Sequence, residues 1–262
     1  MPTIQVRDTS LYYETAGSGL PVLLLHGLGS STRDWQLQVP VFAQKYQVVM
    51  VDSRGHGRSA KPHGRYSVPQ FTADIIAFME ALHIIPAHVL GLSMGGMIAF
   101  QMAVDRPELL RSMVIVNSYP ELVPHSLSDY ITWYRRHAIV QLMGMKRMGE
   151  YLGGVLFPEP HQGELRQTIA QRWLENDKRA YLASTRALFG WSMAARLGDI
   201  RCPTLIIAAD QDYTPVAQKV EYTAKIPGAK LVVIPNSRHA TPIDQPELFN
   251  RTVLEFWEEI GD

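Results

Sequence analysis

The sequence predicts an α/β fold, with a mostly parallel sheet flanked by helices and a helical cap inserted between two sheet strands. Three patterns in its 262 residues support this prediction: short apolar segments, stretches of helical period between them, and one long interval without strands. Strands covered by helices on both faces are continuously apolar, whereas a strand with one wet face alternates. Alternation of such strands with helices favours an open parallel sheet with right-handed crossovers.

The expected strands begin with an alternating pair and continue as apolar runs. Residues 3–16 alternate in polarity around a turn at 8–10, which predicts two strands joined by that turn. After the Gly-Ser-Gly segment at 17–19, six short apolar segments are expected to form buried strands: 22–25, 48–51, 88–90, 113–116, 205–209 and 231–234. Each is far shorter than the roughly 20 residues that span a bilayer.

Helical stretches separate these segments. Apolar residues recur at helical spacing over 71–82, 94–104 and 247–260. The interval from 120 to 197 contains no convincing strand, and its candidate helices lie around 126–140, 145–152, 163–175 and 178–190. We therefore expect one core formed by residues 1–119 and 198–262, carrying a helical cap formed by residues 120–197.

Composition and charge limit the expected partners and cofactors. The 25 Lys and Arg residues balance 25 Asp and Glu residues, so no global field attracts nucleic acid or an anionic membrane. The N-terminus lacks the basic and apolar regions of a secretory signal, so we expect a cytoplasmic protein. Cys202 is the single cysteine, which excludes an internal disulfide and a multi-cysteine zinc site. Because the sequence lacks zinc-protease, phosphate-loop and dinucleotide motifs, no metal or organic cofactor is expected.

The strongest local signal is the G-L-S-M-G segment at residues 91–95, between an apolar strand and a helical stretch. It matches G-x-S-x-G in the strand–turn–helix setting that exposes such a serine above the strand ends. The sharp turn needs small neighbours, which Gly91 and Gly95 provide. The following helix directs its partially positive N-terminus toward the reaction centre. Ser93 is therefore the predicted nucleophile.

A serine hydroxyl needs a base to remove its proton, and a carboxylate orients that base. Of nine histidines, His239 follows the apolar segment 231–234 on a short loop. That is the sheet edge where open α/β sheets build their sites. Asp210 and Asp212 both follow the segment 205–209, and spacing alone does not choose between them.

Along nearly its whole length the chain resembles enzymes of the α/β-hydrolase fold. The landmarks occur in the family's order: H-G-L-G at 26–29, D-S-R-G-H-G-R-S at 52–59, the serine turn at 91–95, A-D-Q-D at 209–212 and N-S-R-H at 236–239. In the family's G-x-x-D motif the aspartate stands fourth, which favours Asp212 although Ala209 replaces the usual glycine. Pro215 comes one residue earlier than expected, and this departure keeps Asp210 as the alternative.

The resemblance also implies an oxyanion hole made of two backbone amides. One is the amide of Met94, directly after the nucleophile, and the other is the amide of Leu28, after His26 and Gly27. Such donors stabilise charge that develops only in the transition state. His26 is better interpreted as a residue that shapes this loop than as a second base.

Serine at the turn distinguishes this chain from haloalkane dehalogenases and epoxide hydrolases, which place aspartate there. Within the family it most resembles small carboxylesterases and 3-oxoadipate enol-lactonases, and this resemblance implies hydrolysis of a carboxylic ester or lactone through an acyl-enzyme. Hydrolases that cleave carbon–carbon bonds of ring-fission products, cofactor-free perhydrolases and a ligand receptor on the same fold remain alternatives. The expected partner is a small-molecule ester or lactone rather than nucleic acid or membrane, and the oligomeric state stays open.

Substrate choice is expected to depend on the cap. Six aromatic and methionine residues stand out there: Tyr130, Trp133, Tyr134, Met143, Met145 and Met148. They could line an apolar pocket, but packing between cap helices is the favoured interpretation. Arg135 and Arg136 could receive a carboxylate, although a solvated helix face is favoured for them.

Overall fold

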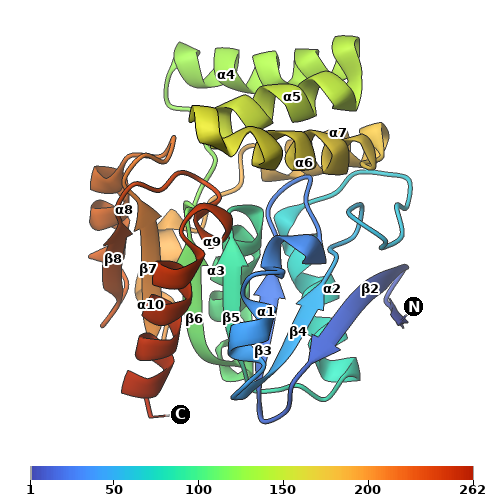
Figure 1. The fold of residues 1–262 in the computed structure, drawn as a ribbon. Helices are drawn as coiled ribbons and strands as arrows, with labels where there is room; N and C mark the ends of the chain where they lie inside the picture. Colours follow the sequence, from blue (N-terminus) through green and yellow to red (C-terminus); the bar gives the residue numbers. More distant parts are fainter. Residues whose placement is uncertain (1, 262) are drawn as a thin grey trace.

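A computed structural model describes residues 2–261, which form one eight-stranded sheet with helices on both faces (Figure 1). The strands are β1 (Thr3–Val6), β2 (Thr9–Ala16), β3 (Leu20–Leu25), β4 (Tyr46–Val51), β5 (Ala87–Leu92), β6 (Leu110–Val116), β7 (Thr204–Ala209) and β8 (Lys230–Ile234). Their order across the sheet is β1-β2-β4-β3-β5-β6-β7-β8. The pairs β1–β2 and β2–β4 are antiparallel, and the remaining pairs are parallel. The predicted strands are confirmed.

The described residues 2–261 also form ten α-helices. They are α1 (Val39–Phe42), α2 (Val68–Ala81), α3 (Met94–Asp105), α4 (Leu127–Ala138), α5 (Gly144–Leu156), α6 (Gly163–Leu174), α7 (Lys178–Leu188), α8 (Val216–Thr223), α9 (Thr241–Asp244) and α10 (Pro246–Glu259). The apolar period located α2 to α7 and α10, whereas α1, α8 and α9 were not predicted because they are too short to show a period. Within residues 2–261, no helix is long and apolar enough to cross a bilayer.

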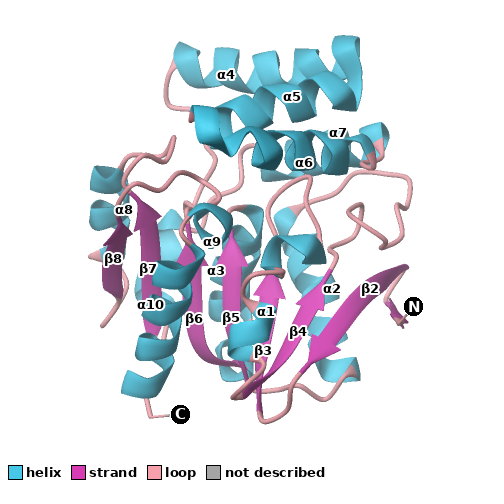
Figure 2. Ribbon diagram, viewed as in Figure 1, coloured by secondary structure: helices cyan, strands magenta, loops and turns pink. Residues whose placement is uncertain are grey.

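Successive residues of the central strands enter two separate cores. On one face, Leu23 and Leu25 belong to a cluster with α2, α3 and α8. On the other face, Val22 and Leu24 belong to a cluster with α1 and α10. Figure 2 shows these helices on the two sides of the strands. Because both faces are covered, the central strands have no polar positions to alternate with, which explains their continuous apolar runs.

The helices α4 to α7 connect β6 to β7 and cross above the arrowheads of the parallel strands (Figure 1). This arrangement confirms the predicted helical insertion between sheet strands. The insertion has its own apolar core, in which Met145 and Met148 pack with Trp173 and Tyr181. The carboxyl ends of the parallel strands, where α/β folds hold their ligands, therefore face the underside of these four helices.

Two of the six residues expected to pack the cap helices together do not fit that interpretation. Tyr134 and Met143 are 62% and 58% exposed. Tyr130 is 41% exposed, but its ring lies 5.8 Å from the ring of Phe189 between their centroids. Trp133 does pack, because its ring lies 4.5 Å from the ring of Phe189 between their centroids. The outer face of α4 is therefore more apolar than an ordinary solvated face, which is why its residues looked like core residues in the sequence.

The turn after β5 is packed too tightly for side chains at its glycines. A Cβ on Gly91 would lie 2.3 Å from the carbonyl oxygen of Gly95, and a Cβ on Gly95 would lie 2.1 Å from the carbonyl oxygen of Leu25. Both obstacles are backbone atoms, which cannot rotate away. The glycines thus let α3 begin directly behind the sheet.

This close approach predicts that Gly95→Ala destabilises the fold. Overpacking a rigid site costs about 1–3 kcal/mol, and we expect the upper end here, measured by urea unfolding. Gly154→Ala in α5 is the control, because no atom lies within 4 Å of an added Cβ there. Alanine favours a helix over glycine by up to about 1 kcal/mol, so the control should gain stability. Equal stability of the two variants would contradict the packing argument.

Candidate active site

Ser93 lies at the turn between β5 and α3, beneath the cap helices. Its backbone has φ 54° and ψ −113°, a positive φ that side-chain-bearing residues rarely adopt. Two hydrogen bonds fasten the turn to the end of β6 and the residues just after it. The Ser93 amide donates to the Val116 carbonyl at 2.9 Å, and the Ser118 hydroxyl donates to the Ser93 carbonyl at 2.7 Å. These contacts hold the strained residue in place.

His239 and Asp212 are in direct contact. Nδ1 of His239 lies 2.8 Å from Oδ1 of Asp212, whose side chain is completely buried. Because a carboxylate only accepts hydrogen bonds, Nδ1 carries the proton and Nε2 carries the lone pair. The imidazole is thus in the tautomer that a general base requires.

Asp210, the alternative carboxylate, makes different contacts. It accepts hydrogen bonds from the backbone amides of Asn236 and Ser237, both at 3.0 Å. These residues begin the loop that leads from β8 to His239. Asp210 therefore fastens the base of the histidine loop, while Asp212 contacts the histidine itself.

Lys219 of α8 is a buried cation on the far side of Asp212. Its Nζ lies 2.6 Å from Oδ2 of Asp212, and neither side chain is exposed. Burial alone would raise the pKa of Asp212, but His239 and Lys219 outweigh it and lower that pKa to about 2. Burial lowers the pKa of Lys219. Lys219 was not predicted from the sequence, since a lysine seven residues after an aspartate forms no motif.

Asn117 joins three loops at the carboxyl edge of the sheet and was also missed. Its Oδ1 accepts from the amide of Ala209 at 2.8 Å, and its Nδ2 donates to the carbonyls of His239 and Arg238 at 3.0 and 3.2 Å. Its φ of 44° is in the left-handed region, which asparagine tolerates better than most residues. One buried amide thus fixes the ends of β6 and β7 relative to the histidine loop.

The loop after β3 lies directly against the serine turn. A Cβ on Gly27 would be 3.6 Å from the Cβ of Ser93. The loop is held by His26, whose Nε2 accepts from the Ser53 amide at 3.0 Å and whose Nδ1 donates to the Gly27 carbonyl at 2.7 Å. Both ring nitrogens of His26 are therefore engaged with backbone.

Two backbone amides near Ser93 have no protein partner. Among the hydrogen bonds within residues 2–261, none is donated by the amide of Leu28 or the amide of Met94. Met94 is the first residue of α3, so its N–H belongs to the first helical turn, which lacks internal acceptors. The helix N-terminus adds partial positive charge there. Both amides can donate to an anionic oxygen of a ligand.

Tyr213 is a third residue that the sequence analysis missed. Its hydroxyl hydrogen-bonds to Nε2 of His239, and its ring stacks on the imidazole with centroids 4.1 Å apart. The Ser93 side chain lowers the pKa of the same phenol, so it lies near this hydroxyl. Desolvation of the phenol and the charge of Asp212 raise the pKa of Tyr213, so it stays protonated and donates to Nε2. The phenol therefore contacts His239 near Ser93, although the residue as a whole is 56% exposed.

The cap contacts the loop after β3 through α6 and the residues that follow it. A Cβ on Gly29 would lie 2.6 Å from the ring of Trp173, and Nδ2 of Asn176 donates to the Gly29 carbonyl at 2.8 Å. The ring of Tyr181 in α7 packs on Trp173 with centroids 5.2 Å apart. The cap thus covers the loop that carries the Leu28 amide.

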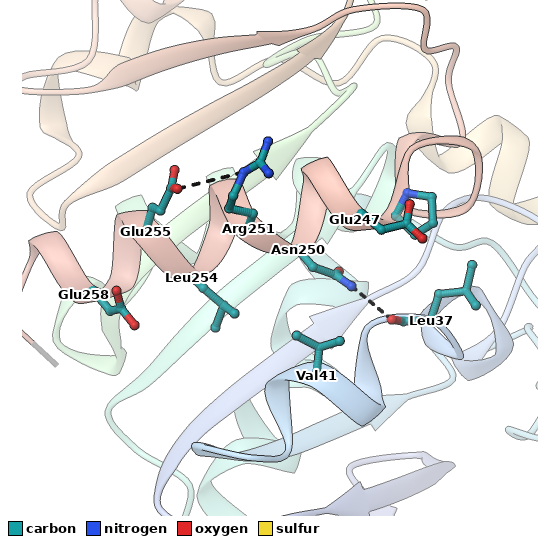
Figure 3. Close-up of a pocket in the computed structure, with 9 residues that line it drawn as sticks. Leu37, Val41, Glu247, Asn250, Arg251, Leu254, Glu255 and Glu258 are labelled. Atoms are coloured by element: carbon teal, nitrogen blue, oxygen red, sulfur yellow. Dashed lines mark hydrogen bonds and ion pairs between the residues drawn. The ribbon is translucent and has the colours of Figure 1, made fainter.

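A surface groove of about 550 Å³ lies between α10 and the segment around α1 (Figure 3). Asn250 crosses it and donates to the carbonyl of Leu37 at 3.1 Å. None of the nine residues that line this groove belongs to the serine turn, the histidine loop or the loop after β3. It is therefore separate from the candidate site.

The described residues give no indication of a metal centre or a reactive thiol. Across residues 2–261, no group of three or more His, Cys, Asp or Glu side chains is arranged to hold a metal ion. Burial raises the pKa of Cys202 to about 11, which keeps the thiol protonated at neutral pH.

The buried Lys219–Asp212 pair predicts a pH-dependent loss of stability in Lys219→Met. Removing one partner of a buried pair costs about 3–5 kcal/mol, because the other charge is left uncompensated. The pKa of folded Asp212 lies below its ordinary 3.8, so its contribution is complete above about pH 4 and is lost as the pH falls toward 2. The difference between wild type and variant should therefore be larger at pH 7 than at pH 3 in urea unfolding.

Lys225→Met is the matched control, since Lys225 is an exposed lysine just after α8. Its unfolding free energy should stay within about 0.5 kcal/mol of the wild type. A loss below about 1 kcal/mol for Lys219→Met at pH 7 would show that the pair does not stabilise the fold.

Comparisons with known proteins agree with this architecture. The alpha/beta hydrolase family matches residues 22–252 of the chain. The chain is 28% identical to 3-oxoadipate enol-lactonase 2 of Acinetobacter baylyi, over 96% of this chain and 94% of the relative. It is 27% identical to (E)-2-((N-methylformamido)methylene)succinate hydrolase of the same species, over 98% of this chain and 97% of the relative.

A solved structure gives the same result. The crystal structure of the enol-lactonase from Burkholderia xenovorans superposes with a TM-score of 0.91 at 25% sequence identity, covering 98% of this chain and all of the enol-lactonase. The family match spans most of the chain, and the strand order, the helical insertion and the serine turn fit it. This protein therefore belongs to the alpha/beta hydrolase family.

Proposed function

We propose that this protein is a serine hydrolase that cleaves a carboxylic ester or lactone through an acyl-enzyme. The observation that carries the proposal is the contact between Nδ1 of His239 and the buried Asp212, because it leaves Nε2 without a proton. A base in that tautomer can accept a proton from a hydroxyl. The enol-lactonases among the similar proteins support this chemistry, since a lactone is a cyclic ester.

In the proposed mechanism, Oγ of Ser93 attacks the substrate carbonyl carbon while Nε2 of His239 takes the hydroxyl proton. The amides of Leu28 and Met94 donate to the oxyanion of the tetrahedral intermediate. His239 then gives the proton to the leaving alkoxide as the C–O bond breaks, which leaves the acyl group on Ser93. A water molecule, deprotonated by His239, attacks the acyl carbon, and collapse of that intermediate releases the acid and restores Ser93.

Asp212 fixes the histidine tautomer and stabilises the imidazolium that forms in each step. With its pKa lowered to about 2, it stays ionised wherever the enzyme is folded near neutral pH. Tyr213 must release Nε2 during the reaction. A general base needs to lie within about 2.6–3.2 Å of the atom whose proton it takes, and the phenol now occupies that position.

The substrate class can be tested with a small panel. It contains p-nitrophenyl acetate, butyrate and octanoate, an enol-lactone and a ring-fission dienoate. Turnover of the short esters or the enol-lactone would support the proposal and report the size of the acyl pocket. Rapid cleavage of the dienoate with negligible ester turnover would replace it with a C–C hydrolase.

Ser93→Ala should abolish this turnover. Loss of the nucleophile of a serine hydrolase reduces kcat by about 10⁶-fold, so the variant should retain only background activity on the best substrate. Tyr213→Phe is the matched control, because it removes the hydroxyl that hydrogen-bonds to Nε2 in this structure and keeps the ring stacked on the imidazole. It should keep kcat within about tenfold of the wild type. If Tyr213→Phe were inactive and Ser93→Ala active, the roles of the two hydroxyls would be reversed.

The two neighbouring carboxylates should differ sharply in their effect on rate. Asp212→Asn should lower kcat by about 10⁴-fold, because an amide favours the wrong histidine tautomer. Asp210→Asn keeps one of the two oxygens that accept from the Asn236 and Ser237 amides, so kcat should fall less than tenfold. Single-substrate kinetics with p-nitrophenyl butyrate measures both. The opposite order would assign the carboxylate role to Asp210.

A further inference from the structure

Arg136 of α4 is connected to the loop after β3 through a chain of side-chain contacts. Its Nε donates to the hydroxyl of Tyr181 at 2.7 Å, and its guanidinium lies 5.8 Å from the centre of that ring. Tyr181 is nearly completely buried and packs on Trp173, whose ring covers Gly29. Two side chains, those of Tyr181 and Trp173, thus connect Arg136 to the loop that carries the Leu28 amide.

A second connection reaches the histidine side of the site. The charge of Arg136 lowers the pKa of the Tyr213 phenol, so the guanidinium is near enough to act on that phenol. The hydroxyl of Tyr213 hydrogen-bonds to Nε2 of His239. Since one connection ends at the loop after β3 and the other at the phenol bonded to His239, the Arg136 side chain lies on the side of α4 that faces the candidate site.

This guanidinium has no carboxylate partner. Among the ion pairs formed within residues 2–261, none includes Arg136, and its single hydrogen bond uses Nε. Arginine remains charged at all relevant pH values, so the four N–H groups on its Nη atoms lack a protein acceptor. A half-buried cation without a counter-ion is unfavourable, and an anion from solution would compensate it.

The same helix carries other polar atoms without partners. Nε1 of Trp133 and both ring nitrogens of His137 are buried and have no hydrogen-bond partner within residues 2–261. Trp133 lies about one helical turn before Arg136, and His137 directly follows Arg136 in the sequence. By contrast, Arg135 is exposed and bonds to the hydroxyl of Tyr151. The solvated-face interpretation therefore fits Arg135 but not Arg136.

We infer that Arg136 binds an anionic group of the substrate, a carboxylate carried on the acyl or the alcohol part of the ester or lactone. The two Nη groups of a guanidinium match the two oxygens of a carboxylate in a bidentate pair. Such a contact would hold the substrate between the cap and Ser93. This inference rests on the proposed hydrolase function and adds the charge of the substrate to it.

Three esters test the inference by kinetics. Mono-(4-nitrophenyl) glutarate carries a carboxylate on the acyl part, 4-(butanoyloxy)benzoate carries one on the alcohol part, and 4-nitrophenyl butyrate is neutral. We expect Arg136→Gln to lower kcat/KM about 10- to 100-fold for at least one anionic ester and less than threefold for the neutral ester. Arg136→Lys should recover part of the loss, since it restores the positive charge but not the two Nη groups that pair with both carboxylate oxygens. Arg135→Gln, the matched control, should leave all three values unchanged.

Binding of glutarate, measured by isothermal titration calorimetry, separates this inference from the proposed function. Binding by the wild type and Arg135→Gln but not by Arg136→Gln would support the anion site even if no ester were cleaved. Turnover of neutral and anionic esters with ratios unchanged in Arg136→Gln would overturn the anion site and leave the hydrolase function standing. Failure of the wild type to bind glutarate and to prefer either anionic ester would also overturn it. Circular dichroism shows whether each variant is folded.

Discussion

The strained backbone of Ser93 is the constraint on which the rest of the structure depends. A positive φ at a side-chain-bearing residue persists only if its surroundings hold it. Here the Ser93 amide and carbonyl are bonded to the chain at and after the end of β6, and Gly95 lies against the end of β3. Ten of the twelve residues of α3 are buried, so the helix cannot shift to relax the turn. The ends of β3 and β6 thus hold the Ser93 turn in place.

A buried polar layer fixes His239, the base of the proposed mechanism. His239 is on a loop, and loops are ordinarily the most mobile parts of a fold. Its position is determined by Asp212 at Nδ1 and by Asn117 at its carbonyl. Asp212 in turn is held by Lys219, because a carboxylate buried beside only one neutral imidazole would remain partly uncompensated. The position of His239 is therefore held by the buried Asp212–Lys219 pair and by the side-chain amide of Asn117.

The sequence predicted those features that depend on local patterns. The strands, the long helices and the serine turn follow from apolar periodicity and glycine placement, and Ser93 and His239 could be proposed from their positions after strands. Three site residues could not be predicted in this way: Lys219, Asn117 and Tyr213. Their contacts join segments that are distant in sequence, and Lys219 and Tyr213 lie in a short helix and a turn that show no apolar period. The choice between Asp210 and Asp212 needed the path of the loop, since both follow the same strand.

The exposure of individual cap residues was the feature that the sequence predicted least well. Arg135 and Arg136 are adjacent, so composition treats them alike, yet they lie about 100° apart around α4. One side chain is exposed and the other reaches the buried Tyr181. The proposed reaction depends on residues that follow β5, β7 and β8 at the carboxyl edge of the sheet, whereas the charge selectivity proposed for the cap depends on one helix face. A change of a few cap residues can therefore alter which substrates bind without disturbing the strained turn or the buried pair beneath it.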